Sequence, residues 1–347
     1  DLARRPAGFN GLGPFDRKEC LLGRAATLPQ SQGSISMGTA LDIVLIASLI
    51  GLAYQSLYAN SLFKSVLHFV VFGLGMSLVW ARLGSPDLAM AEAAIGAGVT
   101  GALTMVAFRR LMEIAPEQNA ARRTARSRLA LPIGVGAGFL VAVVGLAAVD
   151  AEPLPGMAGV AVLETLPSTG LGNPVTAVLL WFRGFDTLLE ITVLLAALLS
   201  AQAVTRLDDP DSSILTQDPD TPLISALLAI IVPLTVLVSV HLLNAGSQSA
   251  GGAFQAAAVM AACGVILALT GRLSTSAQPS RLINLGLLIG ILTFISIGLM
   301  PLTYGQPLLA LSGVWAIYLL ESTMMISIAL ILLLLFTGSI SVRRSDG

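Results

Sequence analysis

Charged residues are scarce in this chain of 347 residues. Asp, Glu, Lys and Arg make up 11% of it and hydrophobic residues 55%, whereas soluble globular domains carry about 25% charged residues. A formal net charge of −1 offers no basic footprint for nucleic acid. Two cysteines, Cys20 and Cys263, and two histidines make neither a disulfide framework nor a metal-ligand set. We therefore predict that the chain is not a soluble domain, not an enzyme, and binds no metal, no cofactor and no nucleic acid.

What the chain has instead is long apolar runs. Runs of about 20 residues cross a bilayer as helices, and these runs are continuous, whereas membrane β-strands alternate. The last run is long enough to tilt or to project past the membrane. We predict an all-α, polytopic integral membrane protein with about nine transmembrane helices. They are expected at residues 40–58, 62–83, 87–109, 129–149, 185–205, 221–243, 252–271, 282–301 and 307–337.

The placement of arginines predicts the orientation. Six of them lie between the third and fourth spans: Arg109, Arg110, Arg122, Arg123, Arg126 and Arg128. Such a loop is cytoplasmic by the positive-inside rule. With nine spans, the cytoplasmic side also receives Arg206, Arg272, Arg281, Arg343 and Arg344. We expect a multi-pass protein of the cell inner (plasma) membrane, with its N-terminus outside and its C-terminus in the cytoplasm.

Polar loops divide the chain into three blocks after an N-terminal tail. Residues 1–36 lack the apolar core of a secretory signal, so we expect a disordered or non-native tail, with Met37 a candidate for the true start. Residues 37–128 hold three helices, and residues 129–220 hold two around an external loop rich in Pro and Gly. Residues 221–347 hold four helices.

The third span carries a carboxylate that a helix cap does not explain. Ser85, Pro86 and Asp87 have the pattern of a helix start, which accounts for Asp87 as a capping residue and leaves an ion site as the alternative. Glu92 lies deeper, where a charge costs at least ~2.5 kcal/mol. We predict that Glu92 belongs to a proton or ion relay, with a buried structural hydrogen bond as the alternative.

Lys64 and His68 are four residues apart in the second span, on one helix face. A lysine near a helix end often only snorkels to the interface, which is the alternative for Lys64. Histidine titrates near neutral pH, so His68 is a candidate for passing protons.

The segment WFRGFDTLLE holds the densest set of ionisable groups. Arg183, Asp186 and Glu190 have i, i+3, i+7 spacing, which predicts one polar stripe on a helix, and Gly184 loosens the chain beside them. An unpaired charge is costly in apolar surroundings, so Arg183 should pair with Asp186 or with a carboxylate of another helix. Glu190 is the deepest and is predicted to titrate. The alternative is a salt bridge that only fixes helix packing.

Two further ionisable groups occur in the last block. His241 precedes a turn rich in Gly and Ser, and Glu321 stands in the middle of the last span. A single glutamate at that depth should meet a partner helix or another subunit. With Asp87, these two residues are secondary candidates.

Three segments resemble known membrane domains. SPDLAMAEAAIGAGVTGALTMVAFRRL resembles the MbhD-like domain of Mrp-type multisubunit Na⁺/H⁺ antiporters and membrane-bound hydrogenases. NPVTAVLLWFRGFDTLLEITV is similar to the adjoining MbhE-like domain, with Trp181 and Leu189 where that family has Asp and Gly. Residues 221–338 resemble the four-helix MrpB-like subunit, with a degenerate Gly-rich turn. The implied three, two and four helices agree with the nine spans.

The resemblance implies a membrane subunit of a cation/proton antiporter or a related ion-pumping complex. A carboxyl group taken out of water favours its neutral form, so it can exchange H⁺, and Na⁺ can compete for the same oxygens. On this reading Glu92, Glu190 and His68 relay protons, while Arg183 and Asp186 set the electrostatics. The expected partners are other membrane subunits of the complex, the lipid bilayer, H⁺ and Na⁺. The alternatives are a non-conducting adaptor between channel subunits and the membrane arm of a redox-driven or CO₂-hydrating complex.

Overall fold

The computed structural model describes most of the apolar chain. The described residues are 37–59, 61–114, 130–150, 157–205, 222–276, 280–311, 313–338 and 341–344. The predicted N-terminal tail, the four arginines of 122–128 and Arg206 lie outside the described residues. The chain divides into two units, residues 1–46 and 47–347. The first unit is described only at the start of helix α2 (Met37–Tyr58), and everything that follows concerns the second.

The first block is a set of closely packed helices. Its elements after α2 are α3 (Leu62–Arg82), α4 (Pro86–Ala91), the π-helix η1 (Glu92–Val99) and α5 (Thr100–Ile114). The side chain of Ser61 caps α3 by accepting from the backbone N–H of Lys64. Glycine allows α3 and η1 to approach closely: a Cβ on Gly73 would lie 3.2 Å from the Cβ of Ala97. The predicted third span is therefore continuous but changes its hydrogen-bond pattern at Glu92.

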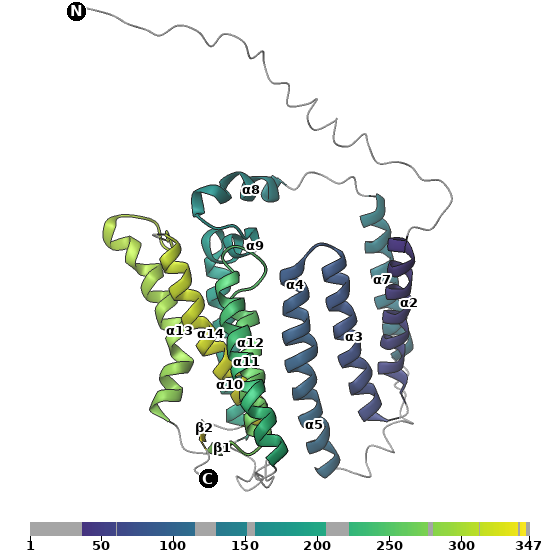
Figure 1. The fold of residues 1–347 in the computed structure, drawn as a ribbon. Helices are drawn as coiled ribbons and strands as arrows, with labels where there is room; N and C mark the ends of the chain where they lie inside the picture. Colours follow the sequence, from purple (N-terminus) through teal and green to yellow (C-terminus); the bar gives the residue numbers. More distant parts are fainter. Residues whose placement is uncertain are drawn as a thin grey trace, which may run out of the picture. The chain divides into compact units, whose positions relative to one another are not determined.

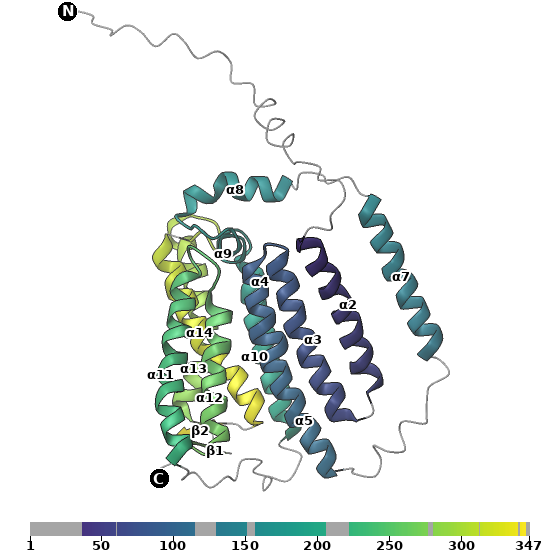
Figure 2. The ribbon, with the colours of Figure 1, turned by 45° about the vertical axis from the view of Figure 1, so that its right-hand side comes forward.

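The middle block differs from the two expected helices. It contains α7 (Ala130–Asp150), α8 (Met157–Thr169), α9 (Pro174–Thr176), the π-helix η2 (Ala177–Phe182) and α10 (Gly184–Thr205). The loop that is predicted to be external includes α8, which runs across the direction of the long helices in both ribbon views (Figures 1 and 2). Pro and Gly do not prevent this helix, because Pro167 lies only in its last turn.

The last block forms most of the buried core. Its elements are α11 (Pro222–Ala245), α12 (Ala253–Leu269), β1 (Leu273–Ser276), α13 (Arg281–Leu299), the 3₁₀-helix η3 (Met300–Tyr304), α14 (Val314–Thr337) and β2 (Ser341–Arg344). Helices α11 to α14 run alongside one another in both ribbon views (Figures 1 and 2). Alanines on α12 allow α14 to pack closely, and Ala256 and Ile317 are both fully buried. Strands β1 and β2 pair antiparallel, from Leu273 with Arg344 to Ser276 with Ser341. The segments after α12 and after α14 therefore lie on the same side, as nine spans require.

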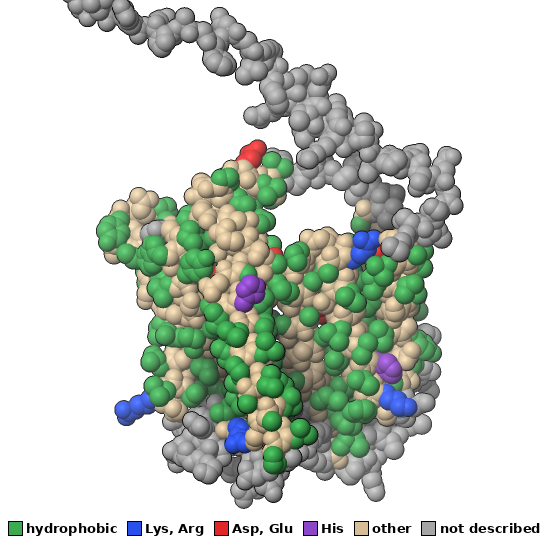
Figure 3. Space-filling model, viewed as in Figure 1, with side chains coloured by type: hydrophobic (Ala, Val, Ile, Leu, Met, Phe, Trp, Pro, Cys, Tyr) green, Lys and Arg blue, Asp and Glu red, His purple; other side chains and the backbone are tan. Residues whose placement is uncertain are grey.

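The predicted membrane class is confirmed. Seven described helices are long and apolar enough to cross a membrane, and two shorter apolar helices, Pro132–Ala148 and Ala253–Leu269, coincide with the remaining predicted spans. Hydrophobic side chains cover the helices on the face shown in Figure 3, and Lys and Arg lie near helix ends. The predicted start of the last span, at residue 307, is wrong. Helix α14 begins at Val314, because Pro307 cannot continue a helix and Gly313 has φ +124°. The orientation stays a prediction.

Candidate functional site

Asp87 joins three separate parts of the chain. It is buried in the first turn of α4, and its Oδ1 accepts from the backbone N–H of Gly251 at 3.0 Å and from Nδ2 of Asn173 at 3.3 Å. The amide of Gln255 also donates to the backbone oxygen of Asp87 at 3.4 Å. The capping explanation is incomplete, because these bonds reach α9 and the turn before α12. Ser85 makes no side-chain cap hydrogen bond, contrary to the prediction from its position.

Glu321 is a buried carboxylate on helix α14. Its side chain is 3% exposed, and its Oε2 has no hydrogen-bond partner in the part of the chain that the structure describes. The backbone of Ala253, the first residue of α12, hydrogen-bonds to it. The predicted partner helix is therefore α12, whose N-terminus is the positive end of its dipole.

Glu190 lies on α10 with Thr187 one turn earlier. The hydroxyl of Thr187 donates to the backbone oxygen of Leu179 at 2.7 Å, which ties α10 to the preceding π-helix η2. The side chain of Glu190 is more exposed than those of Asp87 and Glu321.

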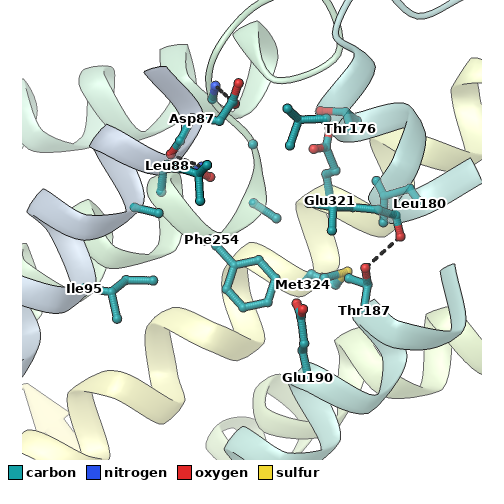
Figure 4. Close-up of a pocket in the computed structure, with 17 residues that line it drawn as sticks. Asp87, Leu88, Ile95, Thr176, Leu180, Thr187, Glu190, Phe254, Glu321 and Met324 are labelled. Atoms are coloured by element: carbon teal, nitrogen blue, oxygen red, sulfur yellow. Dashed lines mark hydrogen bonds between the residues drawn. The ribbon is translucent and has the colours of Figure 1, made fainter. Parts of the chain in front are cut away.

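One cavity brings Asp87, Glu190 and Glu321 together. It has a volume of about 240 Å³ and receives residues from α4, η1, α9, η2, α10, α12 and α14. In Figure 4, Glu190 lies on one side of Phe254 and Met324, and Glu321 and Asp87 lie on the other. None of the described residues that line it is basic. Three carboxylates from the three sequence blocks therefore line one cavity, with Asp87 and Glu321 buried and Glu190 exposed.

Arg183 and Asp186 form the predicted ion pair but not the predicted helical stripe. Arg183 Nη2 lies 2.5 Å from Asp186 Oδ2. Arg183 ends η2 with φ −129° and ψ 35°, and α10 begins only at Gly184. The single helical stripe expected for Arg183, Asp186 and Glu190 is wrong because Arg183 precedes α10, and the chain breaks beside Gly184, where the sequence predicted a looser chain. The two side chains are 69% and 44% exposed, so the pair lies at the protein surface, not in an apolar interior.

Glu92 lies outside the cavity lining. It is the first residue of the π-helix η1, and its carboxylate covers Gly96. A Cβ on Gly96 would lie within van der Waals overlap of Glu92 Oε1. The glycine therefore makes room for this orientation of the carboxylate, on the turn that follows the Asp87 helix start.

Lys64 and His68 share a second cavity and are separate from the three carboxylates. This cavity, of about 210 Å³, lies at the α2–α3 hairpin. His241 is exposed on α11 and lines neither of these two cavities.

Asn173 is the site residue that sequence reasoning missed. It caps α9 through the backbone N–H of Val175, and its amide also donates to the backbone oxygen of Ser249 at 2.8 Å. The Asn-Pro pair at 173–174 is a sequence signal for a helix start. Its bond to Asp87 joins residues 86 positions apart, which no local pattern reveals.

This fold and this site define a class of protein. It is a helical membrane protein with an acidic cavity between its three sequence blocks. Residues 47–113 match the MbhD family of MBH subunits, and residues 223–341 match a domain related to the MnhB subunit of Na⁺/H⁺ antiporter. Both segments carry the motifs noted in the sequence, so the resemblance to Mrp-type antiporter subunits is confirmed. The MbhE-like segment between them stays a prediction.

Individual relatives agree with these families. The chain is 26% identical over 178 residues to the Na⁺/H⁺ antiporter A subunit of Bacillus subtilis, covering 51% of this chain and 22% of the relative. It is 29% identical over 153 residues to the corresponding protein of Alkalihalophilus pseudofirmus, covering 43% of this chain and 18% of the relative. The chain thus spans about a fifth of the length of these relatives. A chain in the structure of the Mrp complex from Dietzia sp. has the same fold, with a TM-score of 0.67 and 21% identity over 95% of this chain and 38% of that one.

Proposed function

We propose that this chain is a membrane subunit of an Mrp-type cation/proton antiporter, assembled with further membrane subunits in the cell membrane. The observation that carries the proposal is the cavity that Asp87, Glu190 and Glu321 line together. The relatives that are named as Na⁺/H⁺ antiporter subunits support the same class.

In the proposed mechanism, the cavity is the place where H⁺ and a cation compete. Burial of a carboxylate favours its protonated form, and a small cation can replace the proton as the partner of the charged form. Glu321 has a free Oε2 in the described structure, so it can accept a proton without breaking an existing hydrogen bond. Glu190, which is more exposed, connects this group to the surface.

The residues outside the cavity have supporting roles in this proposal. Glu92 extends the acidic path along the same span as Asp87, at the start of the π-helix η1, between the lining residues Ala91 and Ile95. Arg183 and Asp186 hold the broken segment before α10 by their ion pair. His68 and Lys64 line another cavity, so the proposed exchange site does not include them.

The adaptor function is the second candidate, and one observation favours it. The two hydrogen bonds that Asp87 accepts connect its helix to Asn173 and to Gly251. A carboxylate oxygen that accepts two such bonds serves packing, and this would hold for a non-conducting clamp. A redox-driven membrane arm is distinguished by the subunits that copurify with the chain.

The experiment compares Glu190→Gln and Glu321→Gln in the assembled complex. Each change keeps the size of the side chain and removes its ability to exchange a proton. We expect both to abolish cation/proton exchange in inverted membrane vesicles, with normal amounts of complex. Glu164→Gln on α8 is the matched control, because Glu164 is exposed and lines neither cavity. Wild-type exchange in both cavity variants would favour the adaptor.

A further inference from the structure

The cavity at the α2–α3 hairpin has the opposite chemistry to the acidic one. Its wall is rich in groups that can donate hydrogen bonds, and no carboxylate of the described residues belongs to it. The lining residues are Tyr54, Gln55, Tyr58, Ala59, Lys64 and His68. The volume of about 210 Å³ exceeds the ~30 Å³ share of a liquid water molecule several times over. A group larger than water therefore fits.

The cavity lies at the ends of two apolar helices. Tyr54 and Tyr58 are in the last turns of α2, and Lys64 is in the first turn of α3. Tyrosines concentrate where membrane helices meet the headgroup layer, and a lysine at a helix end directs its ammonium group to that layer. The two rings stack with centroids 4.7 Å apart. Ser56 Oγ donates to the backbone oxygen of Ser65 at 3.2 Å, which holds the two helix ends together.

Two polar groups of this cavity lack a partner within the described residues. Lys64 is exposed and forms no ion pair with any of them. Nδ1 of His68 is shielded and has no hydrogen-bond partner in the same part of the chain. A shielded polar group is normally satisfied, so the imidazole leaves room for a hydrogen-bonding ligand, and the exposed positive charge of Lys64 beside it favours an anionic one.

We propose that this cavity binds a negatively charged phosphate group, supplied by the headgroup of an anionic phospholipid. Lys64 gives the charge, and the side chains of Tyr54 and Gln55 donate hydrogen bonds to the phosphate oxygens. Basic pockets between membrane helices recognise anionic headgroups in this way. A lipid fits better than free phosphate because Leu57, 80% exposed on the same turn of α2, offers apolar surface to an acyl chain. The proposal is independent of the antiporter assignment.

The test is native mass spectrometry of the whole, delipidated chain with added phosphatidylglycerol or phosphatidylcholine. We expect one phosphatidylglycerol to bind in preference to phosphatidylcholine. Lys64→Gln should weaken that binding about fivefold, the effect of one basic residue near an anionic lipid, whereas Lys64→Arg should retain it. Arg272→Gln is the matched control, because Arg272 is another basic residue at a helix end and bonds to Ser225 Oγ outside the cavity.

Each outcome decides the proposal. Equal losses in Lys64→Gln and Arg272→Gln, or equal binding of the two lipids, would overturn it as general surface attraction. Displacement of phosphatidylglycerol by inorganic phosphate at millimolar concentration would overturn the lipid source and support a free phosphate ligand. Circular dichroism of the Lys64→Gln variant verifies that its helices are intact. Because the readout is lipid binding, the result does not depend on whether the complex exchanges ions.

Discussion

Helices α14 and α7 are similar as sequences and opposite in their surroundings. Both are apolar helices, of 24 and 21 residues. In the most apolar 18-residue stretch of α14, 61% of the residues are buried inside the protein. In α7, every described side chain, from 132 to 148, is exposed. The buried helix carries a glutamate within its span, and the exposed one carries no charge at residues 132–148. An ionisable group is therefore tolerated where protein replaces lipid around it.

The difference extends to close packing at glycine. A Cβ on Gly290, which faces α14, would lie 2.9 Å from Ser327 Oγ and 2.9 Å from Ile191 Cδ1. A Cβ on Gly134 of α7 would have no atom within 4 Å. The same residue type thus has a packing function in one region and none within the described structure in the other.

The largest effect on stability should follow Asp87→Ala, in the buried region. It leaves the N–H of Gly251 and the amide of Asn173 without their acceptor, at a cost of about 3 kcal/mol for two hydrogen bonds to a charged group. Asp87→Asn keeps an acceptor oxygen and should cost less. Thermal unfolding of the detergent-purified chain measures both, and equal stability of Asp87→Ala and the wild type would remove Asp87 from the packing of the three blocks.

A smaller loss should follow Gly290→Ala. The added methyl group overpacks the contact with α14, which typically costs about 1–3 kcal/mol. Gly134→Ala on α7 is the matched control and should be neutral or slightly stabilising, because alanine is the better helix former. Unfolding midpoints of the two variants give the comparison directly. Similar shifts for both would show that α7 is packed as tightly as α14 in the assembled protein.

The smallest effect on stability is expected for Arg183→Gln. The ion pair with Asp186 is largely exposed, so its loss should cost about 1 kcal/mol or less. Quantification of the purified complex would detect a larger role, and a severe loss of assembly would mean that a partner subunit buries this pair.

The sequence predicts the spans well and the site only in part. Continuous apolar runs reveal membrane helices because lipid requires them, and i, i+3 spacing predicts the pair of Arg183 with Asp186. The π-helix at Glu92 is harder to foresee, because it depends on a change of hydrogen-bond register that leaves no periodic signal. The approach of Glu321 to Ala253 and of Asp87 to Gly251 depends on packing between distant blocks. Identifying an ionisable residue within a span is therefore easier than placing it in a cavity.

The most direct test of the central claim is carbodiimide labelling of the assembled complex, with and without Na⁺. Carbodiimides react with protonated carboxyl groups in apolar surroundings, and peptide mass spectrometry locates the modified residue. If the cavity is the exchange site, Glu321 and Glu190 are labelled and Na⁺ slows both reactions, because the cation replaces the proton. Glu164 on α8 gives the reference for an exposed carboxylate. Labelling of Glu321 and Glu190 at rates that Na⁺ does not change would contradict a shared site for H⁺ and cation in this cavity.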